Sequence, residues 1–193
     1  MAYISSVTKE GILFMVNKNT NSQNMITKES IFTALMILMK KKNFKEISIT
    51  EIAKKAGVSR MAFYRNYNIK EDIIATYIDE LFQEYFNEIL NHEKKDIYEN
   101  LRLYFSYFRK NDKLISNLIN SNLINILLEK CVESFHSLSQ DVECHKSYST
   151  EKQKYWIEFI AGGLYNVLTG WAKSGMKESD EYMAKIVFDF IND

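Results

Sequence analysis

A chain of 193 residues that is 46% hydrophobic and 26% charged can bury a core of its own, and its formal net charge of zero argues against a uniformly basic nucleic-acid binder. Its two cysteines are too few for a disulfide scaffold, and no stretch reaches the ~18 apolar residues that span a bilayer. Proline, the strongest helix breaker, is absent and only 6 glycines are present, which favours an all-α fold class.

Positive charge is concentrated toward the N-terminus. Residues 25–75 contain ten Lys or Arg against five Asp or Glu, whereas residues 76–193 contain thirteen against nineteen. A basic segment on an acidic body is expected when only that segment contacts a polyanion, although ordinary scatter can also produce a surplus of this size.

The first predicted helix follows a polar leader. Residues 1–24 show no clear periodicity and end in a polar run, so we predict a flexible leader there. From Ile26 to Lys41, apolar residues such as Ile31 and Leu35 recur at helical spacing, which predicts a helix.

Two short capped helices are predicted next, separated by a glycine turn. Ser48 and Glu51 have the spacing of a capping box, in which each side chain accepts from the other residue's amide. Gly57 can adopt the left-handed conformation of a turn, and Ser59 can cap a second helix that ends near Arg65. This succession is typical of a helix-turn-helix, whose second helix enters the major groove of DNA.

The second short helix has side chains suited to DNA. Phe63 and Tyr67 are predicted to face a small core. Arginine pairs with guanine, small or apolar side chains can contact the thymine methyl, and a tyrosine hydroxyl can donate to a phosphate. Lys70 stands at the start of the next helix, where backbone amides already favour phosphate. The residues left to point outward are Arg60, Met61, Ala62, Tyr64 and Arg65.

The remainder of the chain is predicted to be helical. A long helix capped by Asn68 has a broad apolar face and joins the head to the body. Further helices are predicted over residues 97–110, 112–120, 123–144, 151–176 and 180–191.

Catalysis and metal binding are not expected. The three histidines lie far from any nucleophile motif, so we predict no catalytic residue and no enzyme. Cys144, His145 and His136 match no zinc-ligand spacing, so we predict neither a metal site nor another cofactor. With no signal peptide and two cysteines, the sequence favours a reducing cytoplasm and no membrane association.

The helix predicted over residues 151–176 is apolar around much of its circumference and contains two interior glycines. A close-packed partner helix would offset their cost, so we predict a twofold dimer interface built with the last helix; a kinked core helix of a monomer is the alternative. The predicted interface residues are Gly162, Gly163, Leu164, Val167, Trp171, Met183, Ile186, Val187 and Phe190. A ligand pocket could be lined by Tyr104, Phe105, Phe108, Leu127, Tyr155, Trp156 and Phe159, with plain core as the alternative for each.

The segment from Thr50 to Ser59, together with Phe63-Tyr64, Tyr67 and Lys70, closely resembles the signature of the TetR family of transcriptional regulators. The resemblance covers about residues 28–74 and implies a protomer of about nine helices. It implies a three-helix DNA-binding head, a helical ligand-binding body and dimerisation through the last two long helices.

The resemblance also implies roles for individual residues. Base contacts fall on Arg60, Met61 and Ala62, where many members have Lys, Gly and then Thr or Ser. Phosphate contacts fall on Tyr64, Asn66 and Lys70, with Thr27 near the phosphate-contacting start of the first helix; Ser48, Thr50, Ser59 and Arg65 complete the predicted DNA-binding set. The segment Arg65-Asn66-Tyr67 is more similar to the branch that contains regulators of dihydroxyacetone-kinase operons.

These patterns together predict a leader (1–24), a DNA-binding head (25–70) and a ligand-binding and dimerisation body (71–193). The favoured function is a repressor that binds operator DNA as a homodimer and is released by an apolar or amphipathic small-molecule effector. The alternative is an activator or a partner-dependent regulator whose body binds another protein.

Overall fold

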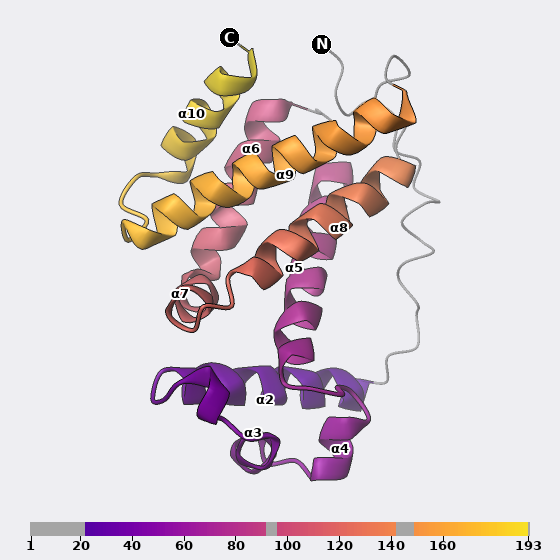
Figure 1. Ribbon diagram of the computed structural model, residues 1–193, viewed down its shortest axis with the longest axis vertical. Coiled ribbons are helices and arrows are strands. Elements are labelled where there is room, and N and C mark those ends of the chain that lie inside the picture. The colour runs from indigo at the N-terminus through magenta and orange to yellow at the C-terminus, as the bar shows by residue number, and fades with distance from the viewer. Residues whose placement is uncertain (1–21, 92–95, 142–148, 193) are drawn as a thin grey trace.

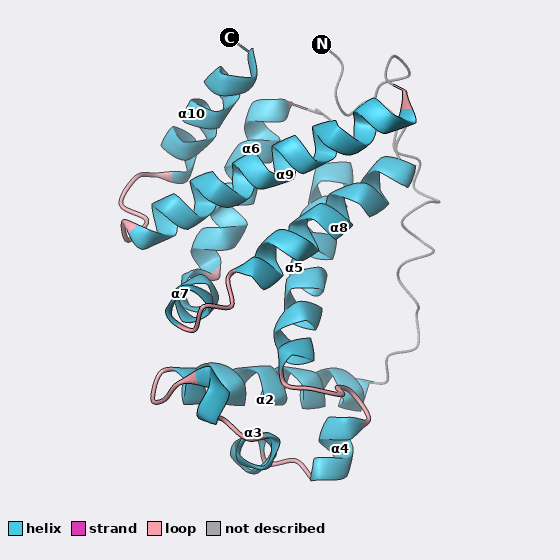
Figure 2. Ribbon diagram, viewed as in Figure 1, coloured by secondary structure: helices cyan, strands magenta, loops and turns pink. Residues whose placement is uncertain are grey.

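The computed structural model describes residues 22–91, 96–141 and 149–192, which form helices and connecting loops (Figures 1 and 2). These ranges contain nine α-helices and one 3₁₀ helix, which confirms the all-α prediction. In chain order they are α2 (Ser22–Met39), η1 (Phe44–Glu46), α3 (Ile49–Ala56), α4 (Arg60–Tyr64), α5 (Glu71–Asn91), α6 (Ile97–Lys110), α7 (Asp112–Asn120), α8 (Asn125–Asp141), α9 (Thr150–Lys173) and α10 (Asp180–Asn192).

The helices form a small head and a larger body joined by α5. Helices α2, α3 and α4 lie together at one end, and α5 rises from them into the body (Figure 1). In the body α8 packs against α5 and α9, and α10 packs along α6. Helix α2 contacts both α3 and α5. The head is therefore held to α5 by helix packing as well as by the segment that connects α4 to α5.

Several helix bounds differ from the predicted ones. Helix α2 begins at Ser22, inside the predicted leader, and the rest of that leader lies outside the described residues. The long helix begins at Glu71 and Asn68 is not its cap; the carboxylate of Asp72 instead accepts from the amides of Asn68 and Ile69. Helices α6 and α7 have the predicted bounds.

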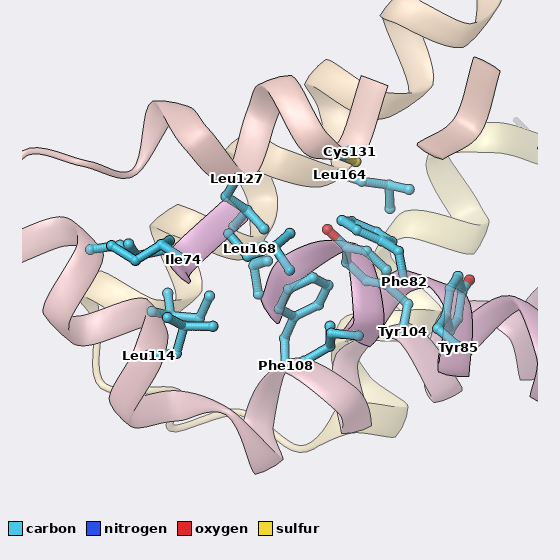
Figure 3. Packing of buried hydrophobic residues seen from close by; sticks show 14 of the residues in the cluster. Ile74, Phe82, Tyr85, Tyr104, Phe108, Leu114, Leu127, Cys131, Leu164 and Leu168 are labelled. Atoms are coloured by element: carbon cyan, nitrogen blue, oxygen red, sulfur yellow. The ribbon is translucent and has the colours of Figure 1, made fainter. Parts of the chain in front are cut away.

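One hydrophobic core runs from the head into the body. In the head, Ile31, Ile52 and Phe63 are fully buried. In the body, Phe82 of α5 lies against Phe108 of α6 with ring centroids 5.9 Å apart, in the aromatic cluster drawn in Figure 3. Because both groups belong to the same core, a rearrangement in the body can reach the head through α5.

A separate contact ties the head to the corner between α6 and α7. The ring of Tyr77 on α5 stacks on Phe32 of α2, with centroids 3.6 Å apart and planes 4° from parallel. The Tyr77 hydroxyl donates to Oδ1 of Asn111, 2.9 Å away, and Nδ2 of the same Asn111 side chain donates to the carbonyl of Tyr107. Tyr77 therefore contacts the head on one side and the body on the other.

The turn between α9 and α10 is held to α6 by Arg109. Its guanidinium lies 4.6 Å from the ring centroid of Trp171, and its Nε donates to Asp180 Oδ1 at 2.6 Å. The other guanidinium nitrogens donate to the carbonyls of Met176 and Glu178. These contacts hold the end of α9, the turn and the start of α10 against α6.

Replacing Tyr77 by alanine should loosen the head. Loss of the stack on Phe32 and of the hydrogen bond to Asn111 should lower the free energy of unfolding by about 2 kcal/mol, measured by urea denaturation. Tyr77→Phe keeps the ring and removes only the hydroxyl, so it should cost about 1 kcal/mol. Wild-type stability in Tyr77→Ala would show that this contact does not anchor the head.

Candidate nucleic-acid interface

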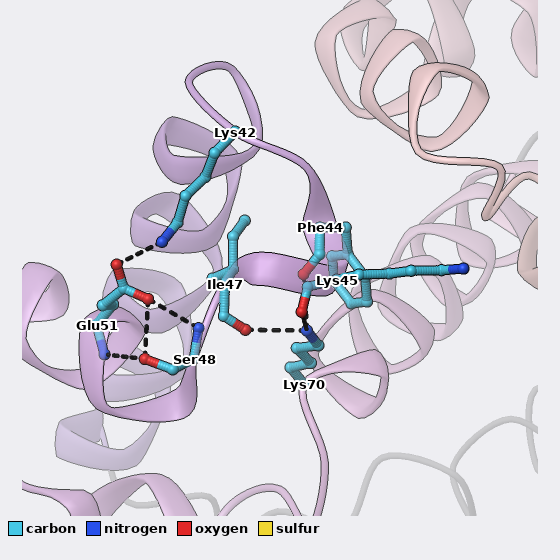
Figure 4. Close-up of polar contacts among 7 residues, drawn as sticks. All are labelled: Lys42, Phe44, Lys45, Ile47, Ser48, Glu51 and Lys70. Atoms are coloured by element: carbon cyan, nitrogen blue, oxygen red, sulfur yellow. Dashed lines mark hydrogen bonds and ion pairs between the residues drawn. The ribbon is translucent and has the colours of Figure 1, made fainter.

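Helix α3 begins at the predicted capping box. Ser48 Oγ accepts from the Glu51 amide at 3.2 Å, and Glu51 Oε2 accepts from the Ser48 amide and hydroxyl, both at 2.9 Å (Figure 4). The other Glu51 oxygen pairs with the Lys42 ammonium. The Lys42 hydrogen bond, followed by the two from Ser48, lowers the pKa of Glu51 from 4.5 to about 2.

The turn after α3 has the geometry predicted for it. Gly57 has φ 70° and ψ 25°, the left-handed conformation that glycine adopts at little cost, and its amide donates to the carbonyls of Ala53 and Lys54. The Val58 amide also donates to Ala53, 3.0 Å away. These bonds end α3 and redirect the chain toward α4.

Helix α4 has one buried and one exposed face. Ser59 Oγ accepts from the Ala62 amide at 3.0 Å, which starts the helix. Phe63 is fully buried and Tyr67, just after the helix, is 5% exposed; burial raises the pKa of Tyr67 to about 12, so its phenol stays neutral in the head core. The opposite face presents Arg60, Met61, Tyr64 and Arg65, of which Met61 is 69% exposed.

The exposed face combines two arginines with two apolar groups. The Arg60 guanidinium carbon lies 6.0 Å from the ring centroid of Tyr64, one turn along the helix. This places a cation, a thioether and a phenol side by side on a helix whose other side is fixed in the core. Such a face can enter a groove and contact base edges and phosphates.

Other predicted DNA-contacting residues are placed differently. Thr50 is exposed, whereas Thr27 and Ala62 are partly buried. The hydroxyls of Ser48 and Ser59 serve as helix caps, and the Asn66 side-chain amide donates to the Ala62 carbonyl at 2.8 Å.

Lys70 makes contacts that the sequence did not predict. Its ammonium donates to the carbonyls of Phe44 (2.7 Å), Ile47 (2.9 Å) and Lys45 (3.3 Å) (Figure 4). These acceptors belong to η1 and the residue after it, 23 to 26 positions earlier in the chain. Sequence spacing alone gave no signal for this contact.

The predicted pocket residues fall into two groups. Tyr104, Phe105, Phe108 and Leu127 are at most 1% exposed and lie in the core of the body (Figure 3), and Trp156 is half-buried. Tyr155 and Phe159 are 63% and 75% exposed, so they line no interior pocket of the protomer. Phe159 lies one turn and Tyr155 two turns before exposed Gly163, on the outward face of α9. Their spacing of four residues was the sequence signal that the three residues share one face of the helix.

The predicted dimer residues also divide by burial. Leu164, Trp171, Met183 and Val187 are buried within the protomer, which corrects their assignment to a dimer interface. They face inward because α9 packs on α7 and α8, and α10 packs on α6. Gly163 and Phe190 are exposed, and Gly162, Val167 and Ile186 are partly buried.

In the described part of the chain, no three His, Cys, Asp or Glu side chains gather as metal ligands. Cys144, His145 and His92 lie outside the described residues. None of the described helices is long and apolar enough to cross a membrane.

Comparisons with known proteins match both parts of the chain. Residues 31–77 match the family described as "Bacterial regulatory proteins, tetR family", and residues 95–193 match a TetR C-terminal family described as "Transcriptional regulator C-terminal region".

Solved structures share the fold at low sequence identity. Lin0861 from Listeria innocua superposes with a TM-score of 0.77 at 19% identity, covering 90% of this chain and 93% of that one. The dihydroxyacetone kinase operon activator DhaS has a TM-score of 0.59 at 18% identity, covering 86% and 94%. FadR from Bacillus subtilis in complex with stearoyl-CoA has a TM-score of 0.51 at 18% identity, covering 83% and 95%.

The capping box makes the head sensitive to acid. Because the fold lowers the pKa of Glu51 from 4.5 to about 2, its contribution is complete above about pH 4.5 and is lost as the pH falls toward 2. Glu51→Gln should therefore lower stability at pH 7 and flatten the loss between pH 4.5 and 2, followed by urea denaturation at each pH. Glu46→Gln, an exposed carboxylate outside the box, is the matched control; an equal flattening in both variants would contradict the assignment.

Proposed function

The chain belongs to the TetR family of bacterial transcriptional regulators, and on that basis we propose that it represses transcription as a homodimer on operator DNA until a small amphipathic effector binds its body. The observation that carries the proposal is the face of α4 that presents Arg60, Met61, Tyr64 and Arg65 while Phe63 holds the helix in the head core.

DNA contact is proposed to follow the order of these side chains along α4. In a helix-turn-helix, residues at the N-terminal end of the second helix contact base edges. Arg60 and Met61 occupy that end here, with a two-pronged donor for guanine and an apolar group for the thymine methyl. Tyr64 and Arg65, at the other end, can reach phosphates.

Dimerisation is proposed through the outward face of α9 together with α10. Each glycine inside a helix costs about 1 kcal/mol relative to alanine, yet a Cβ at Gly162, Gly163 or Gly170 would meet nothing within 4 Å among the described residues of the protomer. No contact within that part of the protomer therefore requires these glycines. Phe159 lies on the same face as Gly163, and Phe190 of α10 is 74% exposed. A second copy packed on this face would offset the glycine cost and cover the rings.

Release by an effector is proposed to act through α5, because this helix belongs to both the head and the body. A ligand can shift the heads only if it binds one arrangement more tightly than the other. FadR from Bacillus subtilis, a structure of the same fold, holds stearoyl-CoA. The aromatic rings packed between α5, α6 and α8 would be suitable neighbours for an apolar moiety, which favours an amphipathic effector.

Arg60→Ala tests the DNA contact. The wild type should bind its own upstream region in preference to random DNA, with an affinity that falls steeply with salt because several phosphates are contacted. The variant should lose about 1–3 kcal/mol of discrimination if Arg60 contacts a base, measured by fluorescence anisotropy. A reporter behind that region should be derepressed in the variant; reduced reporter expression would instead indicate an activator. Equal discrimination in both proteins would rule out a base contact by Arg60.

Gly163→Leu tests the dimer. Gly163 is exposed and a Cβ there meets none of the described residues within 4 Å, so the variant should fold, but the added volume should separate the two copies of α9. Analytical ultracentrifugation at micromolar concentration should show a dimer for the wild type and a monomer for Gly163→Leu. Glu129→Leu adds the same side chain to an exposed site on α8 and should remain dimeric. A monomeric wild type, or a dimeric Gly163→Leu, would contradict this interface.

A further inference from the structure

Lys70 makes an unusually complete set of contacts for a lysine near a DNA-binding surface. A lysine ammonium has three N–H donors, and here three carbonyl oxygens lie 2.7 Å (Phe44), 2.9 Å (Ile47) and 3.3 Å (Lys45) from its nitrogen. The same nitrogen lies 4.5 Å from the centroid of the Phe44 ring. With its donors committed to the protein, the ammonium has none left for a phosphate oxygen.

The acceptors are backbone carbonyls of η1 and of the residue that follows it. The Phe44 carbonyl also accepts from the Ile47 amide, 3.1 Å away, so Lys70 adds a second donor there. The ammonium of Lys70 thus contacts three carbonyls at the corner that leads into α3. The corner is itself fixed, because Phe44 and Ile47 are each only 2% exposed in the head core.

Lys70 is also the residue that immediately precedes α5. It thus connects the first turn of the connecting helix directly to the corner before α3. The chain links α4 to α5 through residues 65–70, and α2 also packs against α5. The Lys70 contact adds a link between the start of α5 and the corner before α3. The ammonium therefore constrains how the helix-turn-helix is oriented on α5.

We propose that Lys70 is a positioning residue, which locks the helix-turn-helix onto α5 and so sets the distance and angle between the two recognition helices of the dimer. The proposal rests on the proposed function, since it needs a dimer that binds two half-sites. Two recognition helices must meet successive major grooves about 34–36 Å apart. A loosened head would still carry its base-contacting side chains but would hold them at less defined positions.

The first test measures head orientation without DNA. Spin labels at Lys54→Cys on α3 and Gln83→Cys on α5, both exposed positions, report the distance between head and connecting helix by pulsed electron resonance. The native cysteines are replaced, and labelled protein is diluted with unlabelled protein so that one protomer is measured. Lys70→Met should broaden the distance distribution, whereas the control Lys45→Met, which loses the same charge from the same corner, should not. Equal widths in the two variants would overturn the proposal.

The second test varies the operator. Duplexes from the upstream region are given one inserted base pair between the half-sites, which rotates one half-site by about 34–36° relative to the other. The wild type should bind the altered duplex much more weakly, and Lys70→Met should lose most of this dependence while keeping the wild-type dependence on salt. A salt slope lower by about two units per dimer would mean that Lys70 contacts phosphate after all.

If the affinity of Lys70→Met falls equally for both spacings, its role is only structural and the proposal fails. Lys70→Gln, which retains two side-chain donors, should lie between wild type and Lys70→Met, and it replaces the latter if that variant does not fold. A wild type that shows no preference for its upstream region would refute the proposed function, while the spin-label measurement would still decide the role of Lys70.

Discussion

The proposed DNA contacts depend on α4, a helix of five residues that is too short to be stable in water by itself. Isolated helices shorter than about 12–15 residues are marginal even with favourable sequences, so α4 (Arg60–Tyr64) and α3 (Ile49–Ala56) must be fixed from outside. The Ser48 and Ser59 side chains accept hydrogen bonds from backbone amides in the first turns of α3 and α4. The Gly57 amide donates to backbone carbonyls in the last turn of α3. Phe63 then anchors α4 in the head core, leaving the opposite face free.

The same constraint applies at the next level, where the head must be fixed to the body. The contacts that do this come from different directions and include the core shared along α5, the stack of Tyr77 on Phe32, and the hydrogen bonds from the Lys70 ammonium to η1. Tyr77 also donates to Asn111 at the corner of α6 and α7, so the head is sensitive to where that corner lies. A ligand that displaced α6 would act on the head through this residue.

Local features of the fold could be predicted from the sequence, and distant ones could not. The capping box at Ser48 and Glu51 and the turn at Gly57 are fixed by residues at most a few positions apart, so their spacing alone specifies them. The acceptors of Lys70 lie 23 to 26 positions away and are backbone carbonyls, which have no sequence signature. The outward face of α9 could not be predicted for another reason. Exposed Tyr155 and Phe159 are large hydrophobic residues, as buried Leu164 is, so residue type did not separate core from surface.

The proposed function requires a symmetric dimer that presents two copies of α4 to operator DNA. Hydroxyl-radical footprinting of the protein on its own upstream region can detect such a complex. We expect two protected patches related by a twofold axis, with centres separated by one helical turn or a multiple of it, about 34–36 Å per turn. A single asymmetric patch, or uniform protection without defined boundaries, would contradict it.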